Sequence, residues 1–395
     1  MSTPLRLGLL YATMFAALGA SIPYMPVLFR ELGFSGTQIA VILSAPMFAR
    51  VLLGPLIAIW ADRFQRRRTP AAILLAAAGA AFLIAGVSRD FPLMAAAGFV
   101  WGVAQPGAVP LLDVMTLRRA RREGFAYGLP RGIGSLGYIA ANLGWGAMLV
   151  VAGARSTPWL AAALLLGAAA LALWLIPPEP VHDDGAEGPP SHRFEGLGEL
   201  LRNRAYVLAV FAAGLSQASH AFYYSFSTLI WTGQGLSTTV IGLLWGTGVA
   251  VEVLFFWCLG RAQARLGPER LLLLGAAAGV LRWSAYAFSP PLELLFPLQA
   301  LHSLSFAATF LGSLQLIERL TPARHASLAQ TLSASLSGGL LIGAATLASG
   351  PLFDAFGARG YGLMALMCAA GFALGLLLFR QPHSSGEGGS ATEPT

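Results

Sequence analysis

Residues 38–61 read QIAVILSAPMFARVLLGPLIAIWA, and residues 62–68, DRFQRRR, follow directly. The first stretch is long enough to cross the hydrocarbon core of a bilayer, which takes about 20 apolar residues. The second stretch carries four arginines, and short cytoplasmic loops hold an excess of basic residues. This one segment therefore predicts a transmembrane helix that ends in the cytoplasm.

The same alternation of apolar run and short loop continues along the chain. Of the 395 residues, 56% are hydrophobic and only 11% are charged, whereas about 25% are charged in an ordinary soluble domain. A lipid bilayer must therefore surround this protein, and the fold class is an all-α membrane protein. Twelve transmembrane spans are predicted, at residues 6–29, 38–61, 70–88, 92–115, 132–152, 158–176, 205–230, 239–260, 270–288, 292–317, 327–348 and 361–379.

The distribution of arginine sets the expected orientation. All 25 basic residues are arginine, and 19 of them fall on the side of the N-terminus when the twelve spans are traced. Four lie on the other side, and Arg50 and Arg282 lie within spans. Because cytoplasmic loops carry the basic excess, we expect a multi-pass protein of the cytoplasmic (inner) membrane with both termini in the cytoplasm.

The chain divides into two similar halves. Residues 177–204 are rich in proline, glycine and acidic residues, which indicates a cytoplasmic linker between six-helix bundles at 1–176 and 205–380. The tail 381–395 is rich in serine, glycine and glutamate and is expected to be disordered. A shift of 202 residues places Arg50 over Glu252 without a gap. Parallel repeats of this kind build one major transporter architecture, with its substrate site between the halves.

Several classes of function are excluded or disfavoured by the residues that are missing. No phosphate-binding Gly-x-x-x-x-Gly-Lys loop is present, so this chain does not itself use ATP for pumping. No histidine and glutamate stand at the spacing of a membrane-embedded metalloenzyme. No basic stripe indicates nucleic-acid binding, and neither a metal nor a cofactor is expected. A channel would not need two unlike charges at equivalent positions of a repeat.

The loop after the second span carries a recognisable motif. Asp62, Arg63, Arg67 and Arg68 match the loop motif of the major facilitator superfamily, although Ala58 and Gln65 stand where that motif has glycines. The resemblance implies the major facilitator fold, with twelve helices in two pseudo-symmetric bundles, and a cytoplasmic gate latch that involves Asp62 and Arg63. A simple loop of positive charge would explain the arginines but not Asp62.

A closer resemblance covers nearly the whole chain. It is to the phenylpropionate-permease-like branch, which is related to the lactose and nucleoside proton symporters. The matching segments follow one another at the expected spans: 110–113, 127–137, 219–226, 242–245 with Glu252, Arg282–Trp283, and Leu301–His302. Phe310 stands where a second histidine is expected. The resemblance implies a proton-coupled carrier of a small organic solute.

Ionisable residues inside the spans are the first candidates for the site, because a charge in a bilayer is costly and faces a cavity or a partner. Arg50 and Glu252 each lie about 12 residues from the outer ends of their spans, about 18 Å deep at 1.5 Å per residue, and His302 about 15 Å deep. Arg282 and His220 are expected to lie shallower.

Glu252 is predicted to carry the coupling proton, with His302 as a second proton relay. Arg50 or Arg282 would supply the counter-charge or hold a substrate carboxylate. The alternative is a static ion pair of Glu252 with either arginine, which would only join helices, and His220 could equally be a packing residue.

Further candidates come from the aromatic residues and from the loop between the fourth and fifth spans. Tyr223, Tyr224, Trp245 and Trp283 could line a site for a solute with a ring, or simply pack. Asp113 and Arg131 flank the inner loop between those spans and are predicted to form a gate pair at the cytoplasmic mouth.

The leading hypothesis is therefore a monomeric proton symporter of a small organic solute that works by alternating access. The alternative is a proton-coupled exporter of drugs or metabolites. Such exporters typically carry a glycine–proline pair in the fifth span, and residues 132–146 contain no proline.

Overall fold

The computed structural model describes residues 1–178, 196–258 and 265–380. These residues form helices and no strand, which confirms the all-α prediction. The helices that make up the membrane passes are α1 (Thr3–Glu31), α2 (Gly36–Ala61), α3 (Arg68–Val87), α4 (Phe91–Glu123), α5 (Gly128–Ala152), α6 (Thr157–Trp174), α8 (Arg204–Ala218), α9 (Ala221–Gly233), α10 (Thr238–Cys258), α12 (Pro268–Ala287), α13 (Leu292–Ala300), α14 (Thr309–Leu320), α15 (Ala326–Ser335), α16 (Ile342–Phe356) and α17 (Tyr361–Phe379).

The helices of the described residues make twelve passes, as predicted. Ten segments are long and apolar enough to cross a membrane, and the last of them, Ala323–Phe379, contains two passes that turn at residues 357–360. Helix α12 supplies the remaining pass, although Arg270 and Arg282 lower its hydropathy. An even number of passes returns the chain to the side where it began.

The predicted spans differ from the helices in two ways. Helix α4 continues to Glu123, beyond the predicted end at 115, so the arginines at 118–122 extend the helix instead of forming a loop. It ends where Gly124 takes a left-handed conformation with φ of 73°. The seventh pass is broken at Ser219–His220 between α8 and α9, and the tenth and eleventh contain π-helical segments, Ser303–Ala308 and Leu336–Leu341.

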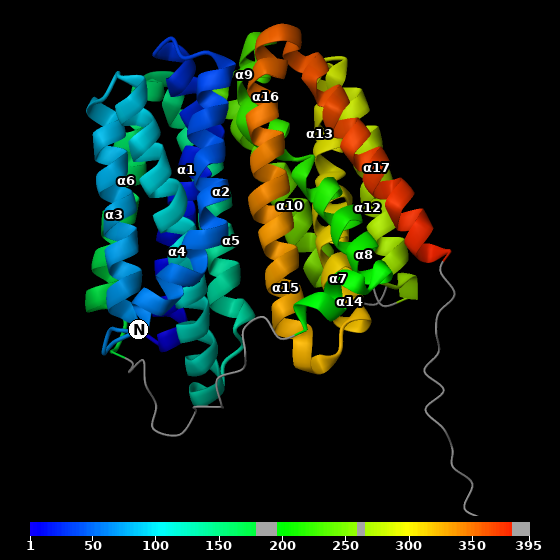
Figure 1. Ribbon diagram of the computed structural model, residues 1–395. Helices are drawn as coiled ribbons and strands as arrows, with labels where there is room; N and C mark the ends of the chain where they lie inside the picture. Colours follow the sequence, from blue (N-terminus) through cyan, green and yellow to red (C-terminus); the bar gives the residue numbers. More distant parts are fainter. Residues whose placement is uncertain (179–195, 259–264, 381–395) are drawn as a thin grey trace, which may run out of the picture.

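Helices α1–α6 gather on one side of the molecule and α8–α17 on the other (Figure 1). We call these groups the N-terminal and C-terminal helices. Most of the predicted linker, 179–195, and the predicted disordered tail, 381–395, lie outside the described residues, so the domain boundaries stay predictions. Within the predicted linker, Leu197–Arg202 forms the short helix α7.

Helix α7 is held against the C-terminal helices by an exposed ion pair. Both oxygens of Glu199 accept hydrogen bonds from Arg324, each at 3.1 Å, and His325 Nε2 lies 3.1 Å from Glu199 Oε2. The guanidinium holds the pKa of the Glu199 carboxyl below its usual range. This contact joins α7 to the turn before α15.

The two ends of the molecule are distinguished by their turns. We call the end with the turns at 62–67, 124–127 and 321–325 the arginine-rich end, and the end with the turns at 32–35, 88–90, 234–237 and 357–360 the far end. The arginine-rich end is the one predicted to be cytoplasmic.

Candidate functional site

A fully buried arginine lies at the centre of the C-terminal helices. Arg282 of α12 is 0% exposed. Its Nη1 lies 2.9 Å from His302 Nδ1 and 3.3 Å from Ser305 Oγ, and its Nη2 lies 2.5 Å from Gln299 Oε1. Within the described part of the chain, these hydrogen bonds all go to uncharged side chains or to histidine, so no carboxylate directly neutralises this guanidinium.

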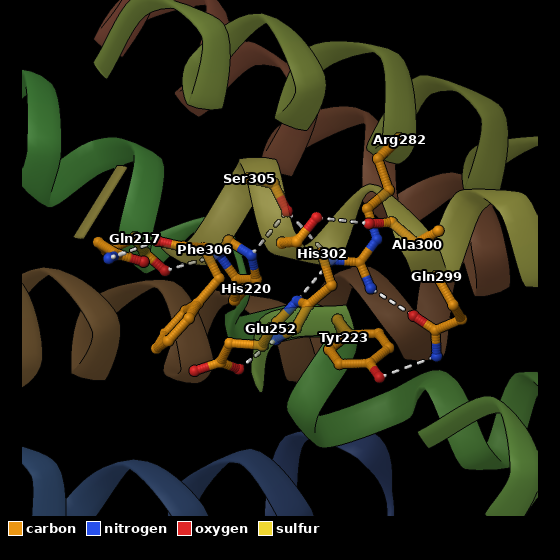
Figure 2. Close-up of polar contacts among 11 residues, drawn as sticks. Gln217, His220, Tyr223, Glu252, Arg282, Gln299, Ala300, His302, Ser305 and Phe306 are labelled. Carbon is orange, nitrogen blue, oxygen red and sulfur yellow. Dashed lines mark hydrogen bonds and ion pairs between the residues drawn. The ribbon is translucent and has the colours of Figure 1, made fainter. Parts of the chain in front are cut away.

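The hydrogen bond from Arg282 decides how His302 is protonated. A guanidinium only donates hydrogen bonds, so His302 Nδ1 must accept. The neutral imidazole then carries its proton on Nε2, which lies 3.6 Å from Glu252 Oε2 (Figure 2). Arg282, His302 and Glu252 thus form a chain of contacts that links the buried charge to the carboxylate.

Two more residues of the tenth pass complete the surroundings of Arg282. Gln299, His302 and Ser305 recur at every third position, so they lie along one face of this pass. Gln299 Nε2 donates to Tyr223 Oη at 3.0 Å. The π-helical segment Ser303–Ala308 begins directly after His302, and such segments are frequent at functional sites.

His220 joins the same cluster at the break in the seventh pass. Its Nδ1 lies 3.1 Å from the carbonyl oxygen of Gln217 and must donate to it, so Nε2 accepts from the Ser305 hydroxyl at 3.2 Å. The guanidinium of Arg282 also lies 4.8 Å from the centre of the Tyr223 ring, close enough for a cation–π interaction.

Of the three residues Arg282, His302 and Glu252, it is Glu252 that lines a described cavity. Its side chain is 23% exposed, against 7% for His302. It lines a cavity of about 420 Å³ between α1, α5 and α10, together with Arg131, Tyr138 and Trp257. A carboxylate placed between a cavity and a buried cation can exchange a proton with water in the cavity.

Arg50 lies in a different cavity from Glu252. Both residues stand 14 positions after the first residue of their helix, Gly36 for α2 and Thr238 for α10, so the repeat does place them at equivalent depth. The Arg50 cavity, of about 240 Å³, is lined by α1, α2, α4 and α9. Among the described residues, Glu252 forms no ion pair with Arg50 or Arg282, so the static pair is not present in this structure.

The predicted depths of Arg282 and His220 did not anticipate that their side chains meet His302. Both were expected to lie nearer the outer end than His302, yet Arg282 bonds to the ring of His302 and the two histidine rings are 5.4 Å apart. Counting residues along a span ignores the tilt of helices and the reach of a long arginine side chain. The three side chains therefore meet within the C-terminal helices.

Asp113 and Arg131 do approach each other, with 3.8 Å between Arg131 Nε and Asp113 Oδ1. Asp113 Oδ1 also accepts hydrogen bonds from Tyr11, at 2.6 Å, and Tyr127, at 2.9 Å. All four residues belong to the N-terminal helices or their turns, so this pair does not bridge the two groups of helices here. Its role in gating stays a prediction.

The motif residues Asp62 and Arg63 are exposed where α2 ends, at the arginine-rich end. Among the described residues, Asp62 has no ion-pair partner. Asp62 does line a small cavity with Arg67 and Pro110. The latch assigned to this motif is therefore not closed in this structure and stays a prediction.

The four candidate aromatic residues have different surroundings. Tyr224 lines the Arg50 cavity. The indole N–H of Trp245 donates to Thr228 Oγ1 at 3.1 Å, and that of Trp283 donates to Ser219 Oγ at 2.8 Å. Tyr223 packs on Trp245, with ring centres 4.5 Å apart. Trp245, Trp283 and Tyr223 therefore support the buried cluster, and Tyr224 is the one with access to a described cavity.

The two groups of helices are joined at the far end. Asp354 of α16 accepts hydrogen bonds from the backbone N–H groups of Gly36, at 2.7 Å, and Thr37, at 2.9 Å, at the start of α2. Tyr24 Oη lies 3.4 Å from the carbonyl oxygen of Thr238. The Glu252 cavity, by contrast, is lined by residues toward the arginine-rich end, such as Tyr127 and Trp257.

Sequence reasoning missed Gln299, Ser305 and Tyr138. Gln299 and Ser305 carried a usable signal, because polar residues at 299, 302 and 305 mark one face of an otherwise apolar pass. Tyr138 carried none, because a single tyrosine in a membrane helix is commonplace.

Comparison with known proteins agrees with this architecture. The model of the MFS_1 like family matches residues 5–361. The chain is 30% identical to the maltose permease of Geobacillus stearothermophilus, over 96% of this chain and 95% of the relative. It is 27% identical to the probable 3-phenylpropionic acid transporter of Escherichia coli (strain K12), over 91% of this chain and 94% of the relative.

A solved structure shows the same fold. The crystal structure of the nucleoside transporter NupG superposes with a TM-score of 0.83 at 17% identity, over 97% of this chain and all of that one. The chain therefore belongs to the MFS_1 like family of the major facilitator superfamily, and it is a multi-pass membrane transporter of small solutes and not an enzyme.

Proposed function

We propose that this transporter takes up a small organic solute by proton symport, and that Glu252 binds the coupling proton. The observation that carries the proposal is the position of Glu252, which lines a cavity on one side and lies 3.6 Å from His302 Nε2 on the other. Uptake of organic solutes fits the two relatives, which are named for maltose and 3-phenylpropionic acid.

The buried cluster can make proton binding depend on conformation. As a carboxylate, Glu252 is attracted by the charge of Arg282, which acts through the His302 ring. Once protonated, Glu252 loses that attraction but is cheaper to keep away from water. A change in the shape of the cavity alters both effects, because water screens the attraction and solvates the carboxylate. Opening to one side and then the other can therefore load and release the proton.

Alternating access requires that the contacts between the two groups of helices exchange between the ends. In this structure the hydrogen bonds of Asp354 and Tyr24 join the groups at the far end. The motif residue Asp62 is exposed and lacks an ion-pair partner among the described residues. This combination supports a form that opens toward the arginine-rich end, which we propose to be the cytoplasmic side.

The test is transport by the purified protein in lipid vesicles, with Glu252→Gln as the variant. Glutamine keeps the shape of the side chain but cannot hold a transferable proton. We expect Glu252→Gln to exchange labelled solute across the membrane at every pH. It should fail to accumulate solute when an inward proton gradient is imposed.

The matched control is Glu293→Gln, because Glu293 is an exposed glutamate at the start of α13. It should accumulate solute as the wild type does. Undiminished accumulation by Glu252→Gln would refute the role of Glu252. Accumulation driven only by an outward gradient of protons from the vesicle lumen would instead identify an antiporter.

A further inference from the structure

The cavity beside Arg50 lies between the two groups of helices. Its wall comes from α1, α2 and α4 on one side and from Tyr224 and Ser225 of α9 on the other. Arg50 stands 14 residues after the start of α2, about 21 Å along the helix at 1.5 Å per residue. The cavity is therefore near the middle of the membrane, where transporters of this architecture bind substrate.

This cavity is distinct from the one that Glu252 lines. Leu18 of α1 contributes to both walls, so the two cavities are neighbours. Tyr224 connects the Arg50 cavity to the buried cluster, because its ring stacks on His220 with centres 5.9 Å apart. A solute beside Arg50 would thus be a neighbour of the proton site without contacting it.

The two serines and the glutamine of this cavity already donate hydrogen bonds to the backbone. Ser21 donates to the carbonyl of Ala17 at 2.7 Å, and Ser225 to that of Ala221 at 2.8 Å. Gln105 Nε2 donates to the carbonyl of Met14 at 3.2 Å. The two serine hydroxyls can therefore donate to a solute only by giving up a bond within their own helix.

Arg50 is the charged residue of this wall. Among the described residues it has neither an ion-pair nor a hydrogen-bond partner, and its Nε is buried. Arg50 is half-buried, and a guanidinium partly withdrawn from water without a partner is costly, which favours a partner that comes from outside the chain. A guanidinium offers parallel N–H donors that match the two oxygens of a carboxylate.

The rest of the wall limits what that carboxylate can be attached to. It is mostly apolar, with Ile22, Met25, Pro26, Met47 and Trp101 among its residues. A cavity of about 240 Å³ is smaller than the roughly 300–1,000 Å³ of pockets for drug-sized ligands. A disaccharide would bury many hydroxyls without partners here, which is unfavourable.

We infer that the solute is a monocarboxylate with a small apolar or aromatic body, and that Arg50 binds its carboxylate. The inference rests on the proposed function and names the substrate class of the same transporter. It assigns Arg50 to the solute and Glu252 to the proton, so the two roles lie in separate cavities.

The first test compares ligands that differ only in charge. Binding to the purified wild-type protein is measured by titration calorimetry, without a membrane gradient and above neutral pH, for 3-phenylpropionate, benzoate and hexanoate and for the amide of each acid. We expect at least one acid to bind about tenfold or more tightly than its amide, because the carboxylate alone gains charge-assisted hydrogen bonds from Arg50.

The second test removes the charge from the protein. Arg50→Gln should bind the acid and its amide alike, whereas Arg50→Lys should keep part of the preference, since it retains the charge but not the paired donors. Arg89→Gln removes an exposed arginine at the far end and should behave as the wild type. The melting temperature of each variant shows whether it is folded.

The outcomes separate this inference from the proton proposal. Two results would each overturn the role of Arg50: no acid binds, whether or not maltose does, or every amide binds the wild type as well as its acid. Glu252→Gln should still bind the acid in this assay. If it does, and yet accumulates solute under a gradient, the proton proposal fails and the substrate class stands.

Discussion

Gln299 shows how much one uncharged residue can contribute to a buried charge. It accepts a hydrogen bond from Arg282 at 2.5 Å and donates one to Tyr223 at 3.0 Å, and it is 0% exposed. An amide is suited to this place because it can accept from a guanidinium and donate to a hydroxyl at the same time. It orients the arginine without adding a second negative charge near Glu252.

Replacement of Gln299 by leucine should therefore destabilise the protein. The variant leaves a buried donor of Arg282 unsatisfied, which costs about 1–3 kcal/mol, and the melting temperature in detergent should fall. The control is Gln330→Leu, since Gln330 is half-buried and its side chain forms an exposed hydrogen bond to a backbone carbonyl at 3.3 Å. An unchanged melting temperature for Gln299→Leu would show that water or Tyr223 replaces the amide.

The identity of the charged residues could be predicted from the sequence, but not their partners. Glu252, His302 and Arg282 stand out because ionisable groups are rare within apolar spans. Their contacts depend on helix tilt and on a π-helical segment after His302, neither of which leaves a pattern in hydropathy. The sequence also did not predict that Arg50 and Glu252 line different cavities. The repeat places them at equivalent positions along their helices, which does not determine how far apart they lie in the plane of the membrane.

At the scale of elements, the start of α2 is capped by a residue from another helix as well as by its own. Ser35 and Gln38 form a reciprocal capping box there. Asp354 of α16 binds two more N–H groups of the same turn, and the positive end of the helix dipole favours its charge. Gly350 allows this approach, since a Cβ there would lie 2.6 Å from the carbonyl oxygen of Gly36.

Asp354→Ala should loosen the far end of the transporter. Loss of an N-cap costs about 0.5–2 kcal/mol. Because Asp354 caps α2 only in the form in which α2 and α16 touch, its removal destabilises that form relative to one in which they are apart. Distances between spin labels at positions 31 and 359, which are exposed at the far end, should shift toward longer values. Asp90→Ala is the control, because Asp90 caps its own helix α4 at 3.2 Å and joins no second helix. Equal distance distributions in both variants would refute the role of Asp354 in joining α2 and α16.

The helices themselves were largely predictable, because about 20 consecutive apolar residues admit few structures in lipid. Their interruptions were not. The break at Ser219–His220 has neither proline nor glycine at the two residues themselves. There the side chains of Ser219 and His220 bond to the backbone carbonyls of Ser216 and Gln217, and such bonds compete with the regular helix. The extension of α4 to Glu123 was missed because charged residues end an apolar run without ending a helix.

For the whole molecule, the arginine census predicts that both termini face the cytoplasm. Green fluorescent protein folds poorly after export but well in the cytoplasm. A fusion to either terminus should therefore fluoresce. Alkaline phosphatase inserted in the turn at 234–237, at the far end, should be active, and the same insertion at 62–67 should be inactive. The reverse pattern would place the arginine-rich end outside the cytoplasm. The proposed opening of this structure would then also face away from the cytoplasm.

The unpartnered guanidinium of Arg50 has an electrical consequence for the transport cycle. A monoanion held by Arg50 and one proton held by Glu252 bring zero net charge into the carrier, so the loaded and empty forms carry the same charge between the two sides. Membrane voltage acts only on net charge that moves, at about 2.3 kcal/mol per charge per 100 mV. Such a cycle would be electroneutral, and it would follow the pH difference across the membrane while ignoring the membrane potential.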